Sequence, residues 1–164
     1  MKDPRIGHGF DLHRLEPGRD LIVGGLKINH DRGCVAHSDG DVVYHAVTDA
    51  ILGALGLEDI GQLFPDDASQ WKDADSSRFV REAVLRMDGA GYRVGNLDVT
   101  VVLQRPKLKD HKATILANLA SLLHCEVSRV NVKGKTHEGV DALGENRAIS
   151  CHASVLLLPD LSEV

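Results

Sequence analysis

The chain has 164 residues, of which 43% are hydrophobic, and a formal net charge of −5 at pH 7. This length fits one domain that can bury its own core, so we expect a single domain over residues 1–164. The acidic balance, with no run of lysines and arginines to offset it, argues against a nucleic-acid-binding protein. No apolar run approaches the roughly 18 residues that a membrane-spanning helix needs, so no membrane association is predicted.

The three cysteines, Cys34, Cys125 and Cys151, are scattered and form no CxxC pair. An odd, scattered set is typical of reduced thiols in an intracellular protein and gives no basis for a structural zinc site built on cysteine. No signal-peptide pattern precedes the first predicted strand, over residues 5–8. We therefore expect an intracellular protein.

The predicted elements alternate strands with helices. Two short strands, 21–23 and 26–28, flank Gly24-Gly25 and are predicted to form a hairpin. A helix is predicted from Asp41, whose carboxylate can cap it, to about Ala54, before Gly56. Later elements are a helix after Asp75-Ser76-Ser77 that ends near Gly89, a strand over 97–104, a helix over 110–123, and strands over 130–135 and 149–158.

This order of elements predicts an α/β (α+β) domain with a sheet of about four strands, helices on one face, and a small hairpin. The segment 56–72 shows no periodicity and is rich in Asp. We expect it to form a long functional loop or a mobile flap.

The segment Asp11-Leu12-His13 carries two side chains that can bind a metal. If the backbone is extended there, Asp11 and His13 point to the same side. A carboxylate and an imidazole on one side make half of a zinc site. His8 lies an odd number of residues from His13, so we expect it to face the other way and to pack in the core.

A second cluster, His37-Ser38-Asp39-Gly40-Asp41, leads into the helix that carries His45 and Asp49. Asp41, His45 and Asp49 are spaced by four and are predicted to share one face of an otherwise apolar helix. Taken singly, His45 could be a buried histidine with a satisfied hydrogen bond. Taken with Asp11 and His13, it completes three N/O ligands with a fourth position open, which is the pattern of catalytic zinc.

The segment Lys133-Gly134-Lys135-Thr136-His137-Glu138 directly follows a predicted strand, where active-site loops commonly lie. Its lysines and threonine can bind phosphate oxygens, and Glu138 can bind a hard cation such as Mg²⁺ or Mn²⁺. The chain contains neither a Walker loop nor a GxGxxG motif. A P-loop nucleotidase and a Rossmann dehydrogenase are therefore disfavoured.

The segment Gln104-Arg105-Pro106-Lys107-Leu108-Lys109 ends a predicted strand with a proline. A plain strand-to-helix turn with solvated lysines would explain it. The functional alternative is a backbone edge whose free N–H and C=O groups bind a nucleobase. The residues alone leave both interpretations open.

Together these segments resemble the 2-C-methyl-D-erythritol 2,4-cyclodiphosphate synthase family of the non-mevalonate isoprenoid pathway. The resemblance extends from about Arg5 to Leu158. It is carried, in order and spacing, by Gly7-His8-Gly9-Phe10-Asp11-Leu12-His13, His37-Ser38-Asp39-Gly40-Asp41 with His45, Asp59-Ile60-Gly61, Phe64-Pro65-Asp66, Arg105-Pro106-Lys107 and Thr136-His137-Glu138.

The resemblance implies a phosphorus–oxygen lyase that converts 4-diphosphocytidyl-2-C-methyl-D-erythritol 2-phosphate to the 2,4-cyclodiphosphate and releases CMP. Asp11, His13 and His45 match the ligands of one zinc ion per subunit. Glu138 matches the ligand of a magnesium or manganese ion. His37 and Thr136 match the positions that stabilise the transition state.

Substrate contacts are also implied. Asp11, His13 and Ser38 are expected to contact the substrate. The methylerythritol end is expected to contact Asp59, Ile60, Gly61, Phe64, Pro65 and Asp66. The cytosine and diphosphate are expected to contact Leu103, Gln104, Arg105, Pro106, Lys107, Leu108, Lys109, Lys135 and Glu138.

The resemblance further implies a homotrimer with active sites between subunits and an isoprenoid diphosphate as a ligand of the central trimer cavity. Three positions depart from the common bacterial pattern: Ala68 replaces an acidic residue, Lys135 replaces threonine, and Gly144-Glu145-Asn146-Arg147 is of plastid type. The expected location is the cytoplasm for a bacterial source and an organelle stroma of plastid type for a processed form.

Two other functions remain open at this point. A zinc-dependent phosphoesterase would use the same metal ligands but would form no cyclic product. A non-catalytic trimeric carrier of isoprenoid diphosphates would need neither Thr136 nor Glu138, and both are present.

Overall fold

The computed structural model describes residues 2–65 and 71–160. Its main sheet has five strands in the order β4-β1-β7-β5-β6, and a separate hairpin pairs β2 with β3. All neighbours in the main sheet are antiparallel except β5 and β6, which are parallel. The strands are β1 (Arg5–Pro17), β2 (Leu21–Val23), β3 (Leu26–Ile28), β4 (Arg32–Cys34), β5 (Tyr92–Val102), β6 (Val130–Lys135) and β7 (Ala148–Pro159).

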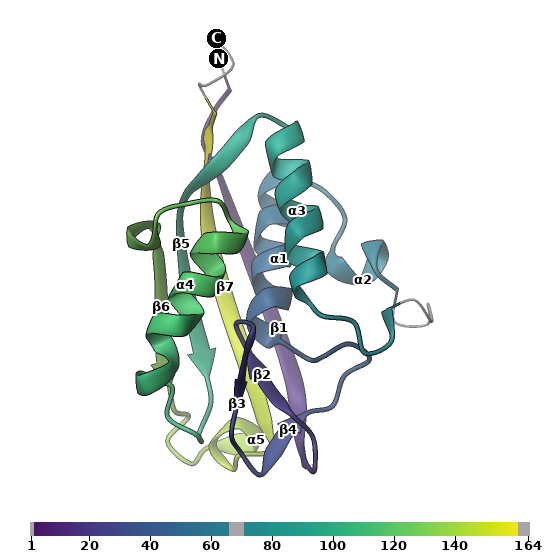
Figure 1. Cartoon of the computed structure of the whole chain (residues 1–164), viewed down its shortest axis with the longest axis vertical. Coiled ribbons are helices and arrows are strands. Elements are labelled where there is room, and N and C mark those ends of the chain that lie inside the picture. The colour runs from purple at the N-terminus through teal and green to yellow at the C-terminus, as the bar shows by residue number, and fades with distance from the viewer. Residues whose placement is uncertain (1, 66–70, 161–164) are drawn as a thin grey trace.

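Three longer helices cover one face of the main sheet (Figure 1). They are α1 (Val42–Leu55), α3 (Ser77–Gly89) and α4 (Lys112–Leu122). Two one-turn helices, α2 (Ile60–Leu63) and α5 (Asp141–Gly144), lie in connecting segments. The core forms between the helices and this sheet face, with Val99, Ile115 and Ile149 fully buried.

The predicted fold class is confirmed, and several element bounds differ from the expectation. The main sheet has five strands instead of about four, because the three-residue edge strand β4 is too short to show alternation. The first strand continues beyond the predicted 5–8 to Pro17, and β5 begins at Tyr92 instead of Leu97. The expected loop over 56–72 contains α2, and its residues 66–70 lie outside the described part.

Two glycines let β1 lie directly against α1. A Cβ atom at Gly7 would lie 1.8 Å from the carbonyl oxygen of Ala50, and one at Gly9 would lie 1.9 Å from that of Ala46. Only glycine permits such a close approach of two backbones. The contact brings the next inward residues of β1 beside the first turns of α1.

Asp41 is fully buried and caps α1. Its Oδ1 accepts hydrogen bonds from the backbone N–H groups of Gly24, Val43 and Tyr44, and its Oδ2 accepts one from Gly25. Burial raises the pKa of Asp41 to about 6, although the backbone N–H groups of Gly25 and Gly24 oppose the rise. Asp41 is therefore a structural anchor between the hairpin and α1 and not a member of the expected metal-facing stripe.

The three longer helices leave the other face of the main sheet uncovered. On β1 it exposes Ile6, Phe10 and Leu12, which are 79%, 49% and 48% exposed. His8 lies on this face and is exposed, so the expectation that it packs in the core is wrong. Its orientation, opposite to that of His13, is as the alternation predicts. We call this side of the sheet the open face.

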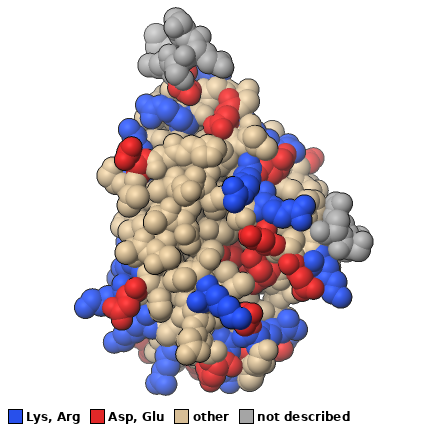
Figure 2. All heavy atoms as spheres, in the orientation of Figure 1, with Lys and Arg blue, Asp and Glu red and all other residues tan. Residues whose placement is uncertain are grey.

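The surface seen in Figure 2 intermixes acidic and basic side chains and shows no continuous basic stripe. Among the described residues, none of the helices combines the length and apolar character that crossing a bilayer would require.

Candidate functional site

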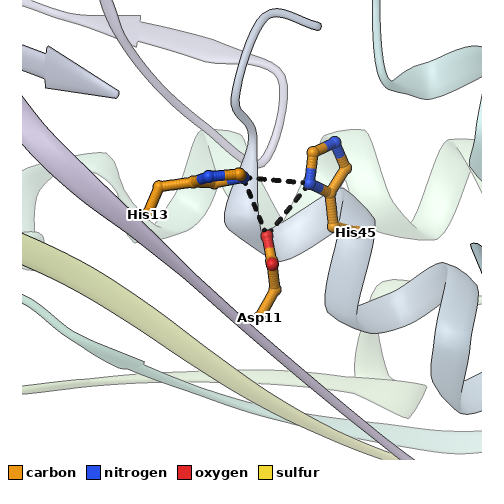
Figure 3. A group of neighbouring side chains, drawn as sticks. All are labelled: Asp11, His13 and His45. Atoms are coloured by element: carbon orange, nitrogen blue, oxygen red, sulfur yellow. Dashed lines mark hydrogen bonds and ion pairs between the residues drawn. The ribbon is translucent and has the colours of Figure 1, made fainter. Parts of the chain in front are cut away.

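Asp11, His13 and His45 converge on one point between β1 and α1 (Figure 3). Asp11 and His13 are inward residues of β1, and His45 is buried in the first turns of α1. Asp11 Oδ2 lies 3.1 Å from His13 Nε2 and 3.0 Å from His45 Nδ1. His13 Nε2 and His45 Nδ1 are 3.2 Å apart. The predicted triad is therefore brought together by the fold.

The triad fits a metal ion. Ligands at about 2.0–2.1 Å from a tetrahedral ion lie roughly 3.3 Å from one another. The three spacings of 3.0–3.2 Å are close to this value. One carboxylate oxygen and two imidazole nitrogens leave a fourth position for a ligand from the adjoining pocket. The donor set and its spacing thus match an open, catalytic type of metal site.

The contacts within the triad shift the pKa values of Asp11 and His45. Burial by itself would raise the pKa of Asp11, but its hydrogen bonds with His13 and His45 outweigh burial and hold this pKa well below its usual range. Burial by itself would lower the pKa of His45, but the hydrogen bond with Asp11 raises it. Because an imidazole nitrogen must be free of its proton to bind a metal, metal uptake at this site competes with protons.

A hydrogen-bond relay fixes the other ring nitrogen of His45. Its Nε2 lies 2.9 Å from Ser76 Oγ and 3.2 Å from Ser38 Oγ. The Ser76 hydroxyl donates to Asp39 Oδ1, and the Ser76 backbone N–H donates to Asp39 Oδ2. Such outer contacts fix the tautomer and ring orientation of a metal-binding histidine. The sequence pattern indicated Ser76 only as the start of a helix, so this role was missed.

Replacing Ser76 by alanine is expected to weaken metal binding by about 10–100-fold, the usual cost of losing a contact to a ligand's second nitrogen. The Ser76 side chain makes no capping hydrogen bond to α3, so the helix should stay intact. Ser77→Ala is the matched control. Competition with a zinc indicator measures both variants, and equal affinities would remove Ser76 from the site.

The triad opens into a pocket of about 290 Å³, which we call the metal pocket. Five further residues predicted from the sequence line it: His37, Ser38, Ile60, Gly61 and Phe64. Its far wall is an aromatic cluster, in which Phe64 lies 5.1 Å from Trp71 and 4.6 Å from Phe79 between ring centroids. The sequence predicted only that Phe79 belongs to the helix after Ser77, and it gave no signal for Trp71.

The other residues of the predicted loop do not line the metal pocket. Asp59 caps α2 by accepting from the Gln62 N–H, and Asp49 accepts from the Ile60 N–H. Pro65 is exposed and is not among the residues that line the pocket. Asp66 and Ala68 lie outside the described residues, so the expectations for them stay untested.

A second pocket, of about 360 Å³, lies beside the carboxyl end of β6. It contains four lysines, and we call it the lysine pocket. Thr136 Oγ1 donates a hydrogen bond to Glu138 Oε1 at 2.7 Å in its wall. Its lining residues are Leu103, Lys107, Leu108, Lys109, Lys112, Gly134, Lys135, Thr136 and Glu138.

Most of the predicted nucleotide segment is at the lysine pocket, but three residues are not. Gln104, Arg105 and Pro106 are absent from its lining, and Gln104 Oε1 instead accepts a hydrogen bond from the His137 N–H. Lys112, in the first turn of α4, lines the pocket and was missed. A larger groove of about 540 Å³, between the hairpin and α4, contains none of the predicted site residues.

The metal pocket and the lysine pocket share no lining residue. The strand register puts Leu12, Ser150, Val102 and Lys135 in one row across β1, β7, β5 and β6. Three strand spacings of about 4.8 Å place the two ends of this row roughly 14 Å apart. Within one chain, the triad and the lysines therefore lie on opposite sides of two intervening strands.

Comparison with known proteins gives a consistent result. The model of the YgbB family matches residues 4–158. The chain is 65% identical over 154 residues to a chloroplastic 2-C-methyl-D-erythritol 2,4-cyclodiphosphate synthase of Arabidopsis thaliana, covering 94% of this chain and 67% of that protein. It is 49% identical over 156 residues to the synthase of Proteus mirabilis (strain HI4320), covering 95% and 98%.

Among solved structures, the chain is similar to a CDP complex of IspF from Plasmodium falciparum, with a TM-score of 0.87 and 40% identity. This match covers 98% of this chain and 99% of that chain. The likeness therefore extends over nearly the whole chain and is not confined to the sheet.

Proposed function

Because this chain belongs to the YgbB family, we propose that it closes 4-diphosphocytidyl-2-C-methyl-D-erythritol 2-phosphate into 2-C-methyl-D-erythritol 2,4-cyclodiphosphate and releases CMP. The observation that carries the proposal is the convergence of Asp11, His13 and His45 in a pocket lined by the predicted substrate residues. Similarity to cyclodiphosphate synthases over 94–95% of the chain supports it. The reaction belongs to the phosphorus–oxygen lyases, because no water is consumed.

Zinc is the metal proposed for the triad, one ion per subunit, because two imidazoles and one carboxylate form a common catalytic zinc set. Zinc there would supply a Lewis acid for a phosphate oxygen of the substrate. Magnesium or manganese is proposed at Glu138, since a carboxylate suits a hard cation that also binds phosphate.

Ring closure joins two ends of one substrate. An oxygen of its 2-phosphate attacks the β-phosphorus, the bond from that phosphorus to the bridging oxygen breaks, and the electron pair leaves with CMP. Little proton transfer is required, so no nucleophilic triad is needed. The protein's task is to hold the two phosphates together and to offset the charge that develops.

The pockets suit this task. Phe64, Ile60 and Gly61 line an apolar wall near the triad for the methylerythritol end. His37, in the same pocket, is proposed to stabilise the transition state by hydrogen bonding, and Thr136 to do so from the lysine pocket. The lysines of that pocket offset the charge of the diphosphate. Because the protein as a whole is acidic, this positive charge has to be supplied locally. Predicted contacts of Gln104, Arg105 and Pro106 would come from the backbone.

The complete site is proposed to form between two subunits of a homotrimer. The residues of the triad and those of the lysine pocket would have to act on one diphosphate, yet about 14 Å of sheet separates the triad from the lysine row within a chain. If the metal pocket of one subunit faces the lysine pocket of the next, both pockets can reach the same diphosphate. A head-to-tail interface of this kind closes into a ring. The exposed Ile6, Phe10 and Leu12 supply apolar surface for such an assembly.

Two further features that the resemblance implies are the ligand of the trimer cavity and the location of the protein. An isoprenoid diphosphate is proposed as a ligand of the central trimer cavity. In the segment that departs from the bacterial pattern, Arg147 forms an ion pair with Glu145 at 2.6 Å. Higher identity to the Arabidopsis thaliana enzyme than to the Proteus mirabilis one favours the plastid-type alternative for location.

The direct test is to incubate the purified protein with the CDP-linked substrate, zinc and magnesium, and to determine the masses of the products. Ring closure yields CMP and a cyclic diphosphate that contains no oxygen from ¹⁸O-labelled water. A phosphoesterase would instead yield a product heavier by one labelled water. A non-catalytic carrier would return the substrate unchanged. Either of these outcomes would overturn the proposal.

Glu138→Gln is expected to keep its bound zinc but to lose most of its turnover, because an amide binds a hard cation far more weakly than a carboxylate. The Thr136 hydroxyl can still donate to the amide oxygen, so the loop should hold its shape. Glu145→Gln is the matched control. Titration of turnover with Mg²⁺ is the measurement, and an unchanged magnesium dependence would remove Glu138 from the mechanism.

A further inference from the structure

A groove outside both pockets lies between the hairpin and α4, and we call it the outer groove. Its volume of about 540 Å³ is within the range of small-molecule sites. It shares no lining residue with the metal pocket or the lysine pocket. Its walls come from the hairpin, α1, α3 and α4, so it lies on the helix-covered side of the sheet (Figure 1). The open face, where the apolar surface proposed for trimer assembly lies, is on the other side.

Tyr44 reaches the outer groove with a hydroxyl that has no partner in the described part of the chain. The residue is only 4% exposed, and it lines the groove. Within residues 2–65 and 71–160, its hydrogen bonds involve the backbone alone: the N–H donates to Asp41, and the carbonyl accepts from Thr48. A Cβ atom at Gly25 would lie 2.2 Å from the hydroxyl oxygen, so the glycine leaves the space that this oxygen occupies. Because a buried tyrosine hydroxyl usually has a hydrogen-bond partner, a ligand in the groove would supply the missing one.

Three carboxylates line the groove around this hydroxyl, those of Asp39, Asp73 and Asp75. Figure 2 shows acidic side chains gathered between the hairpin and the start of α3. Burial and the charges of Asp41, Asp75 and Asp39 raise the pKa of Tyr44, so its hydroxyl stays neutral in a negative field. Within the described residues, Asp73 and Asp75 form no ion pair with a lysine or an arginine. These two charges are therefore available to a cationic ligand.

Two basic side chains, Lys27 and Arg81, also line the groove, and both residues are exposed. Lys27 Nζ is already paired with Asp20 Oδ2 at 2.7 Å, and Asp20 is not part of the lining. Only Arg81 therefore remains to offset three carboxylates. The balance of charge in the groove favours a cation over an anion.

We propose that the outer groove binds an aliphatic polyamine, a chain of methylene groups that carries several ammonium groups, and that this binding is separate from the cyclisation reaction. A compact metal ion does not suit the groove: in the described part of the chain, only the Asp11 triad brings three metal-binding side chains within 4.8 Å of one another. An extended ligand can instead place its ammonium groups at separate carboxylates. Ile22 and Leu122 line the groove and suit the methylene groups. The Tyr44 oxygen can accept a hydrogen bond from an ammonium N–H.

The test is a calorimetric titration of the zinc-loaded protein with spermidine, and one spermidine per chain is expected. Tyr44→Phe removes a hydroxyl without a partner in the described chain, so the fold should be unaffected. Binding should weaken at least about tenfold, the usual weight of a hydrogen bond to a charged group. Asp75→Asn can keep the bond from the Ser77 N–H and should weaken binding roughly two- to fivefold, as an exposed ion pair does. The control is Asp88→Asn, the same change of charge on α3 outside the groove, which should bind spermidine as the original protein does.

Nuclear magnetic resonance locates the ligand without any substitution. Spermidine should shift the signals of the Gly25 backbone amide and the Asn118 side-chain amide, which line the outer groove. The signals of Gly61 in the metal pocket and Gly134 in the lysine pocket should not move. Zinc content and thermal unfolding check that the variants fold, so the result does not depend on cyclisation. The proposal is overturned if spermidine does not bind, if it binds the original protein, Tyr44→Phe and Asp75→Asn equally, or if an equal concentration of Mg²⁺ displaces it.

Discussion

His45→Ala protein is expected to purify with almost no zinc and to have no measurable turnover. The substitution removes one of three ligand atoms that lie 3.0–3.2 Å apart, and the remaining Asp11 and His13 offer only two. Because outer contacts alone cost about 10–100-fold in affinity, the loss of a direct ligand should cost more. Elemental analysis of the purified protein measures the effect.

Asp49→Asn is the matched control, since Asp49 follows His45 by four residues on α1. Its carboxylate accepts a hydrogen bond from the Ile60 N–H, and the amide oxygen of asparagine can keep that bond. This variant should retain its zinc. Equal zinc content in the two variants would contradict the assignment of His45 as a ligand.

Gly9→Ala is expected to destabilise the protein by roughly 3 kcal/mol, at the upper end of the cost of overpacking. The new Cβ would lie 1.9 Å from the Ala46 carbonyl oxygen and 2.7 Å from the Ala50 nitrogen. Both atoms belong to the backbone, so no change of rotamer relieves the clash and α1 must move away from β1. Since His45 precedes Ala46, this movement also opens the triad and lowers zinc affinity.

The control for this prediction is Gly53→Ala in the same helix. A Cβ there meets only the His8 carbonyl oxygen, at 3.9 Å. Alanine is favoured over glycine in a helix by about 1 kcal/mol, so this variant should be slightly more stable than the original. Denaturant unfolding of the metal-free proteins compares the two. A Gly9→Ala protein as stable as Gly53→Ala would show that the close approach does not constrain the fold.

The ligand triad was predictable because local periodicity is sufficient to orient its members. Alternation along β1 put Asp11 and His13 on one side, and helical spacing put His45 among buried residues. Their proximity to one another was not derivable from periodicity. It depends on Gly7 and Gly9, which let the strand and the helix touch. The resemblance to a known family provided this link.

The predictions that were wrong or incomplete concern residues whose surroundings depend on packing between segments that are distant in the sequence. The orientation of His8 followed from alternation, but whether its face is covered depends on where the helices pack. Ser76 reaches His45 only because α3 packs against α1, and Trp71 joins the metal pocket through ring contacts with Phe64 and Phe79. No local pattern carries that information.

In the proposed trimer, the triad of one subunit and the lysine pocket of its neighbour form one site. Two inactive variants, His45→Ala and Lys107→Glu, can test this arrangement when they are unfolded, mixed and reassembled together. His45→Ala retains an intact lysine pocket, and Lys107→Glu retains an intact triad. With equal amounts and random assembly, roughly one quarter of the interfaces in a ring combine the two intact halves.

Turnover of the reassembled mixture, measured as CMP released, is therefore expected to return to about a quarter of the value for the original protein treated in the same way. Each variant reassembled alone should remain inactive. Light scattering should report trimers in all three samples. Mixed trimers that recover no activity, or a fully active monomer, would contradict the shared site.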